Sequence, residues 1–559
     1  MVPRPLKHSV TSILFLALLS TLAAAELKIG SSNTATADPT VPVPKTTACK
    51  VILFKGFKFD DFSPRNFTYT PPADCAPPWA KVVLEADFSV TKGIQYDRTA
   101  NIWIGPTNIY FGTTSEPDPS DGRHWHVERD LTTYSSLFTV PQDGAVDLFN
   151  IYNKTYNGLL HGSATLYFYP LPPKQAAPRV ADLVIGFSGS STGGTVALGS
   201  PTTLLEQTLT LPTNIENIFF DVFAQGQSTD EFWYSCVPND IAGELEDCGS
   251  TAFRESEVTI DGTPAGVAPV YPWIFTGGID PFLWIPIPGV QTLNFKPYQV
   301  NLTPFAGLLS DGNPHTIALS VFNADNYFSA TAVLRLYLDQ SATQVSGAVT
   351  SNTLTAPNPA IVENLKVTKN GSLIGTVGTK SAHNFEISGY VNTSHGLVTT
   401  TVKQEIKFSN LQYFKATDSQ FEQNIKQGTK IQSVVTSKTP STTTVTTVRH
   451  DWPLVVDINY VVAPDGSATE TTTSNQFFEG SESARRNGIA TTFGENRNRV
   501  ISTDTLNFDS NGNFTGNSGT SSSQRYFAAD STGYCYSRLI TSAANVLSSI
   551  TDGVGCTGN

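Results

Sequence analysis

Residues 93–105, GIQYDRTANIWIG, place an acid and a base side by side in a run rich in apolar residues. Side chains of a strand alternate between its two faces, so Asp97 would share one face with two amides and an indole, and Arg98 would lie on the other. A polar row of this kind either faces water or lines a site. A carboxylate in such a row is a candidate for acid–base chemistry.

Further acids and indoles occur in five other motifs of the first two-thirds of the chain: TTSEP, RHWHVERD, DEFWY, AFRESEV and FTGGIDPFLW. Carboxylates accept hydrogen bonds from sugar hydroxyls, and indole faces pack against the C–H surfaces of sugar rings. The combination predicts a carbohydrate site. Its candidate residues beside Asp97 are Arg98, Glu116, Trp125, Asp230, Glu231, Trp233, Arg254, Glu255, Asp280 and Trp284.

Each candidate also has a purely structural interpretation. Glu116 could shape the turn before Pro117, and the acids of DEFWY could lie in a solvated loop. The two arginines could simply pair with nearby carboxylates. The histidines of HWH share one face without a visible third ligand, so we expect no metal and no cofactor. A serine triad is also disfavoured, because no Gly-x-Ser-x-Gly motif occurs.

Length and charge restrict the possible classes of protein. A chain of 559 residues exceeds what one hydrophobic core supports, so two or three domains are expected. The net charge is -13, and lysine and arginine are scattered along the chain instead of clustered. Nucleic acid is therefore not an expected partner.

The N-terminal 25 residues have the order of a secretory signal: basic residues, a short apolar run, and three alanines that end at Ala25. An uncleaved membrane anchor is the alternative, but the apolar run is shorter than the ~18 to 20 residues of a spanning helix. We expect cleavage after Ala25 and no stable membrane partner. The mature chain would be secreted, or sent to the cell wall or vacuole.

Glycosylation acceptors and cysteines fit a secreted chain. Six cysteines suit disulfides in an oxidising compartment. Sequence alone allows 15 pairings of six cysteines. Short loops close at the least entropic cost, which favours Cys49 with Cys75, Cys236 with Cys248, and Cys535 with Cys556. Asn-x-Ser/Thr acceptors occur at Asn66, Asn153, Asn301, Asn370, Asn392 and Asn513.

Short alternating runs separated by Gly, Pro, Asn and Asp follow Cys49 and indicate an all-β protein. Their spacing is typical of jelly-roll-like sandwiches. Helical patterns are scarce, and residues 421–431 and 539–550 are the best candidates. Residues 26–48 are rich in Thr, Pro and Ser and have little to bury, so we expect an exposed, mobile lead-in.

An internal repeat divides the first two-thirds of the chain. The run VERDLTTYSSLF, followed by Asp-Gly, resembles YQVNLTPFAGLL, also followed by Asp-Gly. We therefore predict two tandem sandwiches, at residues 49–172 and 178–342, joined by the proline-rich YPLPPKQAAP. Residues 346–559 are rich in Thr and Ser, and we expect a third β-rich domain that supports the other two.

Together these motifs resemble the peptide N-glycosidase A family, the peptide-N4-(N-acetyl-β-glucosaminyl)asparagine amidases. The resemblance rests on YDRTANIWIG, TTSEP, WHVERDLTTYSSL, DEFWYS, FRESEVTIDG, YPWIFTGGIDPFLW and NLTPFAGLLSDG, which span about residues 79 to 340. It implies hydrolysis of the amide between asparagine and the first N-acetylglucosamine of N-linked glycopeptides or glycoproteins. It implies no metal.

A more distant resemblance, to a bacterial amidase of the same activity, implies that Asp97 is the leading catalytic residue. Asp97 would activate a water, and Arg98 or Arg254 would stabilise the charge that grows on the amide oxygen. Glu231 and Glu255 are the candidate helper acids, since the glutamates of the bacterial enzyme would fall near Asn150 and Ser250, which are not acidic. Trp125 or Trp233 would cover the N-acetylglucosamine.

The sequence is also compatible with two other functions. A secreted carbohydrate-binding protein could use the same acids and indoles to hold a glycan without cleaving it. A glycoside hydrolase could use a pair of carboxylates to cut between sugars.

Overall fold

A computed structural model describes residues 27–368 and 371–556. The strands of these residues form five sheets, and the helices between them are short, which confirms the predicted all-β class. The predicted signal sequence at residues 1–25 lies outside the described residues. Among the residues that are described, no helix has the length and apolar character to cross a bilayer.

Residues 49–170 fold into two four-stranded sheets, ordered β1-β8-β3-β6 and β2-β7-β4-β5. The two sheets enclose one core, in which Phe88, Tyr110 and Phe168 are buried. The 3-10 helix η1 (Thr132–Thr139) follows the second edge strand of the first sheet. The strands are β1 (Cys49–Phe59), β2 (Arg65–Tyr69), β3 (Trp79–Val90), β4 (Thr99–Ile104), β5 (Thr107–Thr113), β6 (Arg123–Asp130), β7 (Gln142–Asp147) and β8 (Leu160–Pro170).

Residues 183–338 repeat this arrangement. One sheet has the order β10-β17-β12-β15, with β9 also paired to β17, and the other has the order β11-β16-β13-β14. The strands are β9 (Leu183–Phe187), β10 (Val196–Leu198), β11 (Leu205–Thr210), β12 (Ile215–Gln227), β13 (Glu255–Ile260), β14 (Thr263–Pro269), β15 (Tyr298–Asn301), β16 (Pro314–Phe322) and β17 (Tyr327–Leu338). The helices are η2 (Ser228–Phe232), α1 (Asn239–Leu245), η3 (Pro281–Trp284), η4 (Thr303–Phe305) and α2 (Ala306–Leu309).

The internal repeat of the sequence corresponds to one set of hydrogen bonds made twice. The side chains of Asp130 and Asn301 accept from the backbone N–H of Thr132 and Thr303, at 2.9 and 3.0 Å. The hydroxyl of each threonine then accepts from a backbone N–H of the neighbouring strand, β3 in one case and β12 in the other, at 3.1 Å in both. The same short motif therefore ends the edge strand of a sheet in each half.

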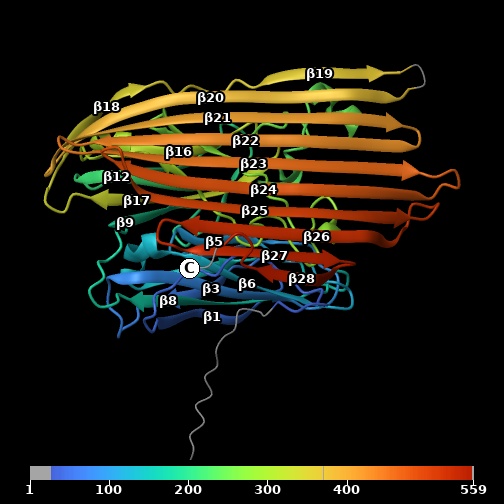
Figure 1. Cartoon of the computed structure of the whole chain (residues 1–559), viewed down its shortest axis with the longest axis horizontal. Coiled ribbons are helices and arrows are strands. Elements are labelled where there is room, and N and C mark those ends of the chain that lie inside the picture. Colours follow the sequence, from blue (N-terminus) through green and yellow to red (C-terminus); the bar gives the residue numbers. More distant parts are fainter. Residues whose placement is uncertain (1–26, 369–370, 557–559) are drawn as a thin grey trace, which may run out of the picture.

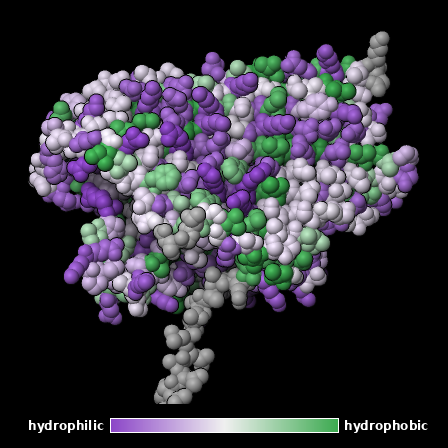
Figure 2. Space-filling model, viewed as in Figure 1, coloured by the Kyte–Doolittle hydropathy of each residue, from purple (hydrophilic) through white to green (hydrophobic). Residues whose placement is uncertain are grey.

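The third part of the chain is a single large sheet that lies across the other two parts (Figure 1). Its outer face is covered by many hydrophilic side chains with scattered apolar ones (Figure 2). Its inner face shares one core with residues 183–338, through residues such as Phe408, Trp452 and Leu454. Its strands are β18 (Ser346–Asn352), β19 (Ala360–Val367), β20 (Leu373–Thr393), β21 (Gly396–Thr417), β22 (Gln420–Lys438), β23 (Thr443–Val462), β24 (Ala468–Arg486), β25 (Ile489–Phe508), β26 (Phe514–Asp530), β27 (Cys535–Ala543) and β28 (Val546–Asp552).

Both predicted helices are wrong. Residues 421–431 belong to β22, where every second residue from Ile425 to Ile431 is buried against the core. Residues 539–550 form β27, a turn and β28, and Ala544 and Asn545 of the turn have positive φ. The short apolar runs in these segments fit period two as well as a helix, and hydrogen-bonded pairing with neighbouring strands decides for the strand.

The lead-in is not the exposed segment that its composition predicted. Ala37 is fully buried, and its backbone N–H donates to Oε1 of Gln524 at 2.6 Å. The backbone N–H of Val41 donates to Glu128 of β6 at 2.6 Å. The Thr34 hydroxyl donates to Ser115, next to Glu116, at 2.9 Å. Small residues such as alanine let this segment pass through a narrow gap. It therefore links the large sheet to the two sheets of residues 49–170.

The three predicted disulfides are confirmed. Cys49–Cys75, Cys236–Cys248 and Cys535–Cys556 are each bonded, and no cysteine among the described residues is free. Each bridge closes a local loop of its own part of the chain.

Candidate active site

Asp97 lies just before β4, in the irregular residues 94–98, and not inside a strand as predicted. Gln95 is buried and Tyr96 is 54% exposed, as the predicted alternation requires, whereas from Ala100 to Ile104 every residue of β4 is buried. The carboxylate of Asp97 turns toward the second sheet pair, where its Oδ2 accepts from the backbone N–H of Gly277 at 3.0 Å. This contact brings residues 180 positions apart together at the junction of the two halves.

Glu116 lies beside Asp97. Its Oε1 accepts from the backbone N–H of Asp97 at 3.1 Å. Glu116 follows β5, which pairs antiparallel with β4, so the end of β5 returns to the residues that precede β4. The backbone N–H of Arg98 also donates to the Thr114 hydroxyl at 2.9 Å, which holds the two segments in register.

Glu231 comes from the second half, in the 3-10 helix η2 at the end of β12. Its neighbour Asp230 is fully buried and accepts from Nε of Arg254 at 2.8 Å and from two backbone N–H groups at 2.8 Å each. This pair fixes η2 in place. Asp230 and Arg254 therefore hold the helix that carries Glu231, and neither has the exposure that a predicted substrate contact would require.

The close approach of the Asp97 and Glu116 carboxylates depends on the absence of a side chain at Gly277. A Cβ at this position would overlap Oε1 of Glu116 and come within 3.3 Å of Oδ1 of Asp97. The hydroxyl of Thr276 donates to the carbonyl of Thr114 at 2.7 Å and so anchors the glycine loop on the first half. The sequence motif FTGGID contained this residue, but its role was not predicted.

Burial raises the pKa of all three carboxyl groups. It is the largest cause for Asp97, whose pKa is raised even though the Gly277 N–H and Arg98 oppose the shift. For Glu116, burial and the nearby Asp97 raise the pKa to about 7. For Glu231, burial and the charges of Asp97 and Glu116 raise it to about 8. At neutral pH Glu231 therefore keeps its proton, and Glu116 is close to the midpoint of its titration.

Glu231 has no side-chain hydrogen bond among the described residues, whereas Asp97 accepts one from a backbone amide. A backbone donor favours the ionised form of a carboxyl group. The arrangement is therefore asymmetric. Asp97 is placed to be ionised, and Glu231 is placed to keep a proton.

Arg98 and two tyrosines border this cluster. The guanidinium of Arg98 donates to Gln95 at 3.0 Å and to Asn150 at 3.3 Å, and its charge lowers the pKa of Asp97 and Glu116. The rings of Tyr96 and Tyr156 lie 5.3 Å apart. The sequence did not predict this pair, because Tyr156 is 60 residues from Tyr96 and lies outside the acidic motifs.

The three predicted sugar-stacking tryptophans lie elsewhere. Trp233 is 2% exposed and packs in the core against Phe408. Trp284 is also 2% exposed and donates to the carbonyl of Gly278 at 2.8 Å. Trp125 is stacked on Phe88 and borders a cavity that does not include the carboxyl cluster. Burial leaves these indoles no open face toward the acids, because large apolar rings gain most from the core.

Two other predicted acids, Glu255 and Asp280, make contacts that stabilise the fold. Glu255, a candidate helper acid, accepts from or donates to Nδ1 of His383 at 2.7 Å, and so joins β13 to β20 of the large sheet. Asp280 is fully buried and accepts from the backbone N–H of Phe282 at 2.9 Å, which caps η3. Neither residue joins Asp97.

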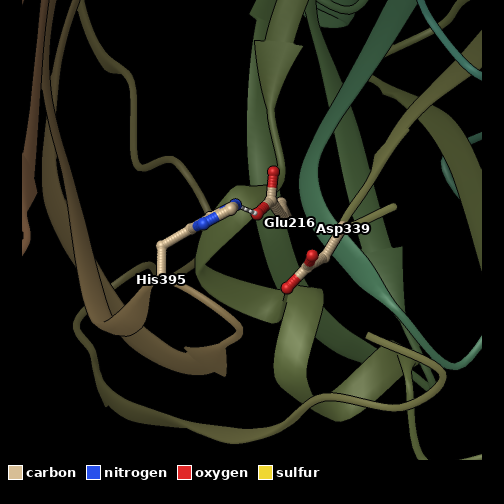
Figure 3. A group of neighbouring side chains, drawn as sticks. All are labelled: Glu216, Asp339 and His395. Atoms are coloured by element: carbon tan, nitrogen blue, oxygen red, sulfur yellow. Dashed lines mark ion pairs between the residues drawn. The ribbon is translucent and has the colours of Figure 1, made fainter. Parts of the chain in front are cut away.

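Glu216, Asp339 and His395 form a further group of titratable side chains (Figure 3). His395 lies on the turn between β20 and β21 and pairs with Glu216 at 3.3 Å. Asp339 already accepts three hydrogen bonds, two from Ser394 and one from the N–H of Ser341. These contacts give the group a role in joining the large sheet to β12 and β17.

The region that holds the carboxyl cluster is similar to known proteins. The family model described as peptide N-acetyl-beta-D-glucosaminyl asparaginase amidase A matches residues 38–355. A curated relative from Prunus dulcis, peptide-N4-(N-acetyl-beta-glucosaminyl)asparagine amidase A, is 32% identical over 393 residues, which cover 66% of this chain and 67% of the relative. The chain belongs to the amidase A family.

Two solved structures are also similar to this amidase A chain at low scores. PNGase F, a glycosylasparaginase from Flavobacterium meningosepticum, has a TM-score of 0.35 and 15% identity over 52% of this chain and 96% of its own. PNGF-II has a TM-score of 0.35 and 12% identity over 52% of this chain and 66% of its own. We draw no conclusion about the site from likenesses at this score.

The raised pKa values predict that this amidase A chain loses stability as the pH rises. Folded Glu231 keeps its proton up to a pKa of about 8, whereas in the unfolded chain it titrates near 4.5. The folded state therefore binds more protons between these values, so the contribution is complete below about pH 4.5 and is lost toward about pH 8. Glu231→Gln does not titrate and should show a shallower fall in Tm over this range, measured by calorimetry.

Glu386→Gln, at an exposed position of β20, is the matched control and should retain the wild-type slope. A wild-type slope in Glu231→Gln as well would contradict the assignment of a raised pKa to Glu231.

Proposed function

We propose that the carboxyl cluster of this family member hydrolyses the amide bond between asparagine and N-acetylglucosamine in N-linked glycopeptides, giving aspartate and a released glycosylamine. Membership of the amidase A family supports the reaction. The observation that carries the assignment of the site is the meeting of Asp97, Glu116 and Glu231 at the junction of the two halves. Amide hydrolysis needs both an ionised and a protonated group, and this cluster offers both.

Asp97 is the proposed general base. Its ionised form is stabilised by the N–H of Gly277 and by Arg98, so it can take a proton from a water as that water attacks the amide carbon. A carboxylate that is largely out of bulk water is also a stronger base, since its pKa is raised toward the working pH. We assign Arg98, and not the buried Arg254, to the charge that grows on the amide oxygen.

Glu231 is the proposed general acid. Because it keeps its proton up to a pKa of about 8, it can donate that proton to the leaving nitrogen at neutral or weakly acidic pH. Glu116, which has a pKa of about 7 and accepts from the backbone N–H of Asp97, can take part in returning the proton from Asp97 to Glu231 after the water has been activated. The atoms balance: water supplies the hydroxyl of the new aspartate and the proton of the released amine.

We further propose that each sheet pair is a jelly roll. The orders β1-β8-β3-β6 and β2-β7-β4-β5 recur in the second half as β9-β17-β12-β15 and β11-β16-β13-β14, which supports two domains at about 49–172 and 178–342. Residues 346–559 would be the third domain. An experimental structure with different strand orders would exclude this layout.

Mass spectrometry of a defined N-glycopeptide tests the activity. Incubation with the purified chain should convert the glycosylated asparagine to aspartate and release the glycan with its two core N-acetylglucosamine residues intact. Asp97→Asn should lower kcat by about 10³-fold, in the range that a single acid or base contributes. Asp240→Asn, at an exposed position of α1, should have wild-type activity.

Two results would overturn the proposal. Tight binding of an unchanged glycopeptide would indicate a carbohydrate-binding protein, and cleavage between the core sugars would indicate a glycoside hydrolase. Full activity in Asp97→Asn would place the chemistry at another site.

The tyrosine pair beside the cluster is the proposed surface for the substrate. Tyr96 directly precedes Asp97 and is about half exposed, and its ring lies 5.3 Å from that of Tyr156. Rings in this position can pack against the sugar or the peptide next to the scissile bond.

Loss of one ring should therefore weaken binding more than turnover. Tyr156→Ala should raise KM about three- to tenfold with a smaller change in kcat, as expected for the removal of one aromatic contact. Tyr156→Phe keeps the ring and should retain a KM close to that of the wild type. Equal KM values in the alanine variant and the wild type would remove the pair from the binding surface.

A further inference from the structure

A second cavity, separate from the carboxyl cluster, lies between the second sheet pair and the large sheet. Its volume is about 520 Å³, within the range of ~300 to 1,000 Å³ that is usual for pockets that hold small ligands. Tyr271, Trp273 and Tyr298 line it from one side, and His450 and Trp452 of β23 line it from the other. None of the three proposed acids, Asp97, Glu116 or Glu231, borders it.

Aromatic rings line part of this cavity, and two buried nitrogen atoms of these rings lack a hydrogen-bond partner. The rings of Tyr271 and Trp452 lie 5.4 Å apart, as do those of His450 and Trp452. Nε1 of Trp452 and Nδ1 of His450 are both buried and have no hydrogen-bond partner. Burial lowers the pKa of His450 to about 4, so its ring is neutral at physiological pH. Unpaired polar atoms next to ring faces suit a ligand that is neutral, has hydroxyl or amide groups, and has an apolar side.

A glycosylation acceptor also lines the cavity. Asn301, in the sequence Asn-Leu-Thr, lines the cavity beside the exposed side chains of Asn217 and Gln299. Oδ1 of Asn301 accepts from the N–H of Thr303, whereas Nδ2, the atom that would carry a sugar, has no partner among the described residues. At two other acceptors, Asn392 and Asn513, Nδ2 donates to a neighbouring side chain.

We propose that this cavity is a saccharide-binding site and that its occupant is the core of an N-linked glycan attached to Asn301. N-Acetylglucosamine has the required chemistry, since its ring has an apolar face and its hydroxyl and amide groups can pair with Trp452 and His450. The glycan would lie between the two parts that form the cavity walls and would join them. The inference concerns this chain's own glycan and does not depend on the proposed amidase activity.

Native glycan trimming tests the proposal. The full chain would be produced in a host that N-glycosylates, with Asp97→Asn so that it cannot remove its own glycans. Peptide mapping should show glycan at Asn301. An endoglycosidase that cuts between the two core sugars should trim folded Asn301 about tenfold more slowly than Asn153, and both at equal rates after denaturation.

Two variants separate the glycan from the fold. In Asn301→Asp and Asn153→Asp the side chain keeps the Oδ1 that accepts the local backbone hydrogen bond and loses the glycan. Both substitutions add one negative charge, so Asn153→Asp is the matched control for that charge. Asn301→Asp should lower Tm by about 2 °C, and Asn153→Asp should leave it unchanged. Trp452→Phe keeps a ring, removes the Nε1 donor, and should speed trimming at Asn301 without affecting Asn153.

An unmodified Asn301 overturns the proposal, even if free N,N′-diacetylchitobiose binds, because the cavity would then take an external sugar. Equal trimming rates at Asn301 and Asn153 in the folded protein, or an unchanged Tm in Asn301→Asp, would overturn it as well.

Discussion

The proposed chemistry depends on the unfavourable free energy of placing three carboxyl groups together in a largely buried site. Burial raises the pKa of Asp97, Glu116 and Glu231; Asp97 adds to the shift of both glutamates, and Glu116 adds to that of Glu231. The charge of Arg98 opposes the shifts of Asp97 and Glu116. A cluster of this kind is unfavourable for folding, so the rest of the structure must hold it in place. The same cost makes it useful, because one group can be ionised while another keeps its proton.

The contacts that hold the cluster come from both halves of the molecule. The Thr276 hydroxyl and the Gly277 N–H attach a loop of the second half to the first, and the buried pair of Asp230 and Arg254 fixes the short helix that carries Glu231. On the far side, Glu255 binds His383 of the large sheet. Residues that the sequence marked as chemical therefore form two groups: one at the reaction site, and one that supports the segments leading to it.

This division explains how much could be predicted from the sequence. The all-β class follows from period-two alternation, and the disulfides follow from loop length. Asp97 and Glu231 were found because their motifs combine acids with aromatic residues. Gly277 could not be found, since its role depends on how closely Glu116 approaches from a distant strand. The indoles Trp125 and Trp233 were misjudged because a sequence does not show whether an aromatic residue near an acid points into the core.

The central claim is that Glu231 donates a proton that it holds because of its surroundings. The pH dependence of kcat/KM on a defined N-glycopeptide tests it most directly, since this profile reports the acid and base of the free enzyme. For the wild type, we expect kcat/KM to fall on a basic limb near pH 8, the pKa of Glu231. Glu231→Gln should lower kcat/KM about 10²-fold and abolish that limb. An unchanged basic limb in Glu231→Gln, at any level of activity, would contradict the account.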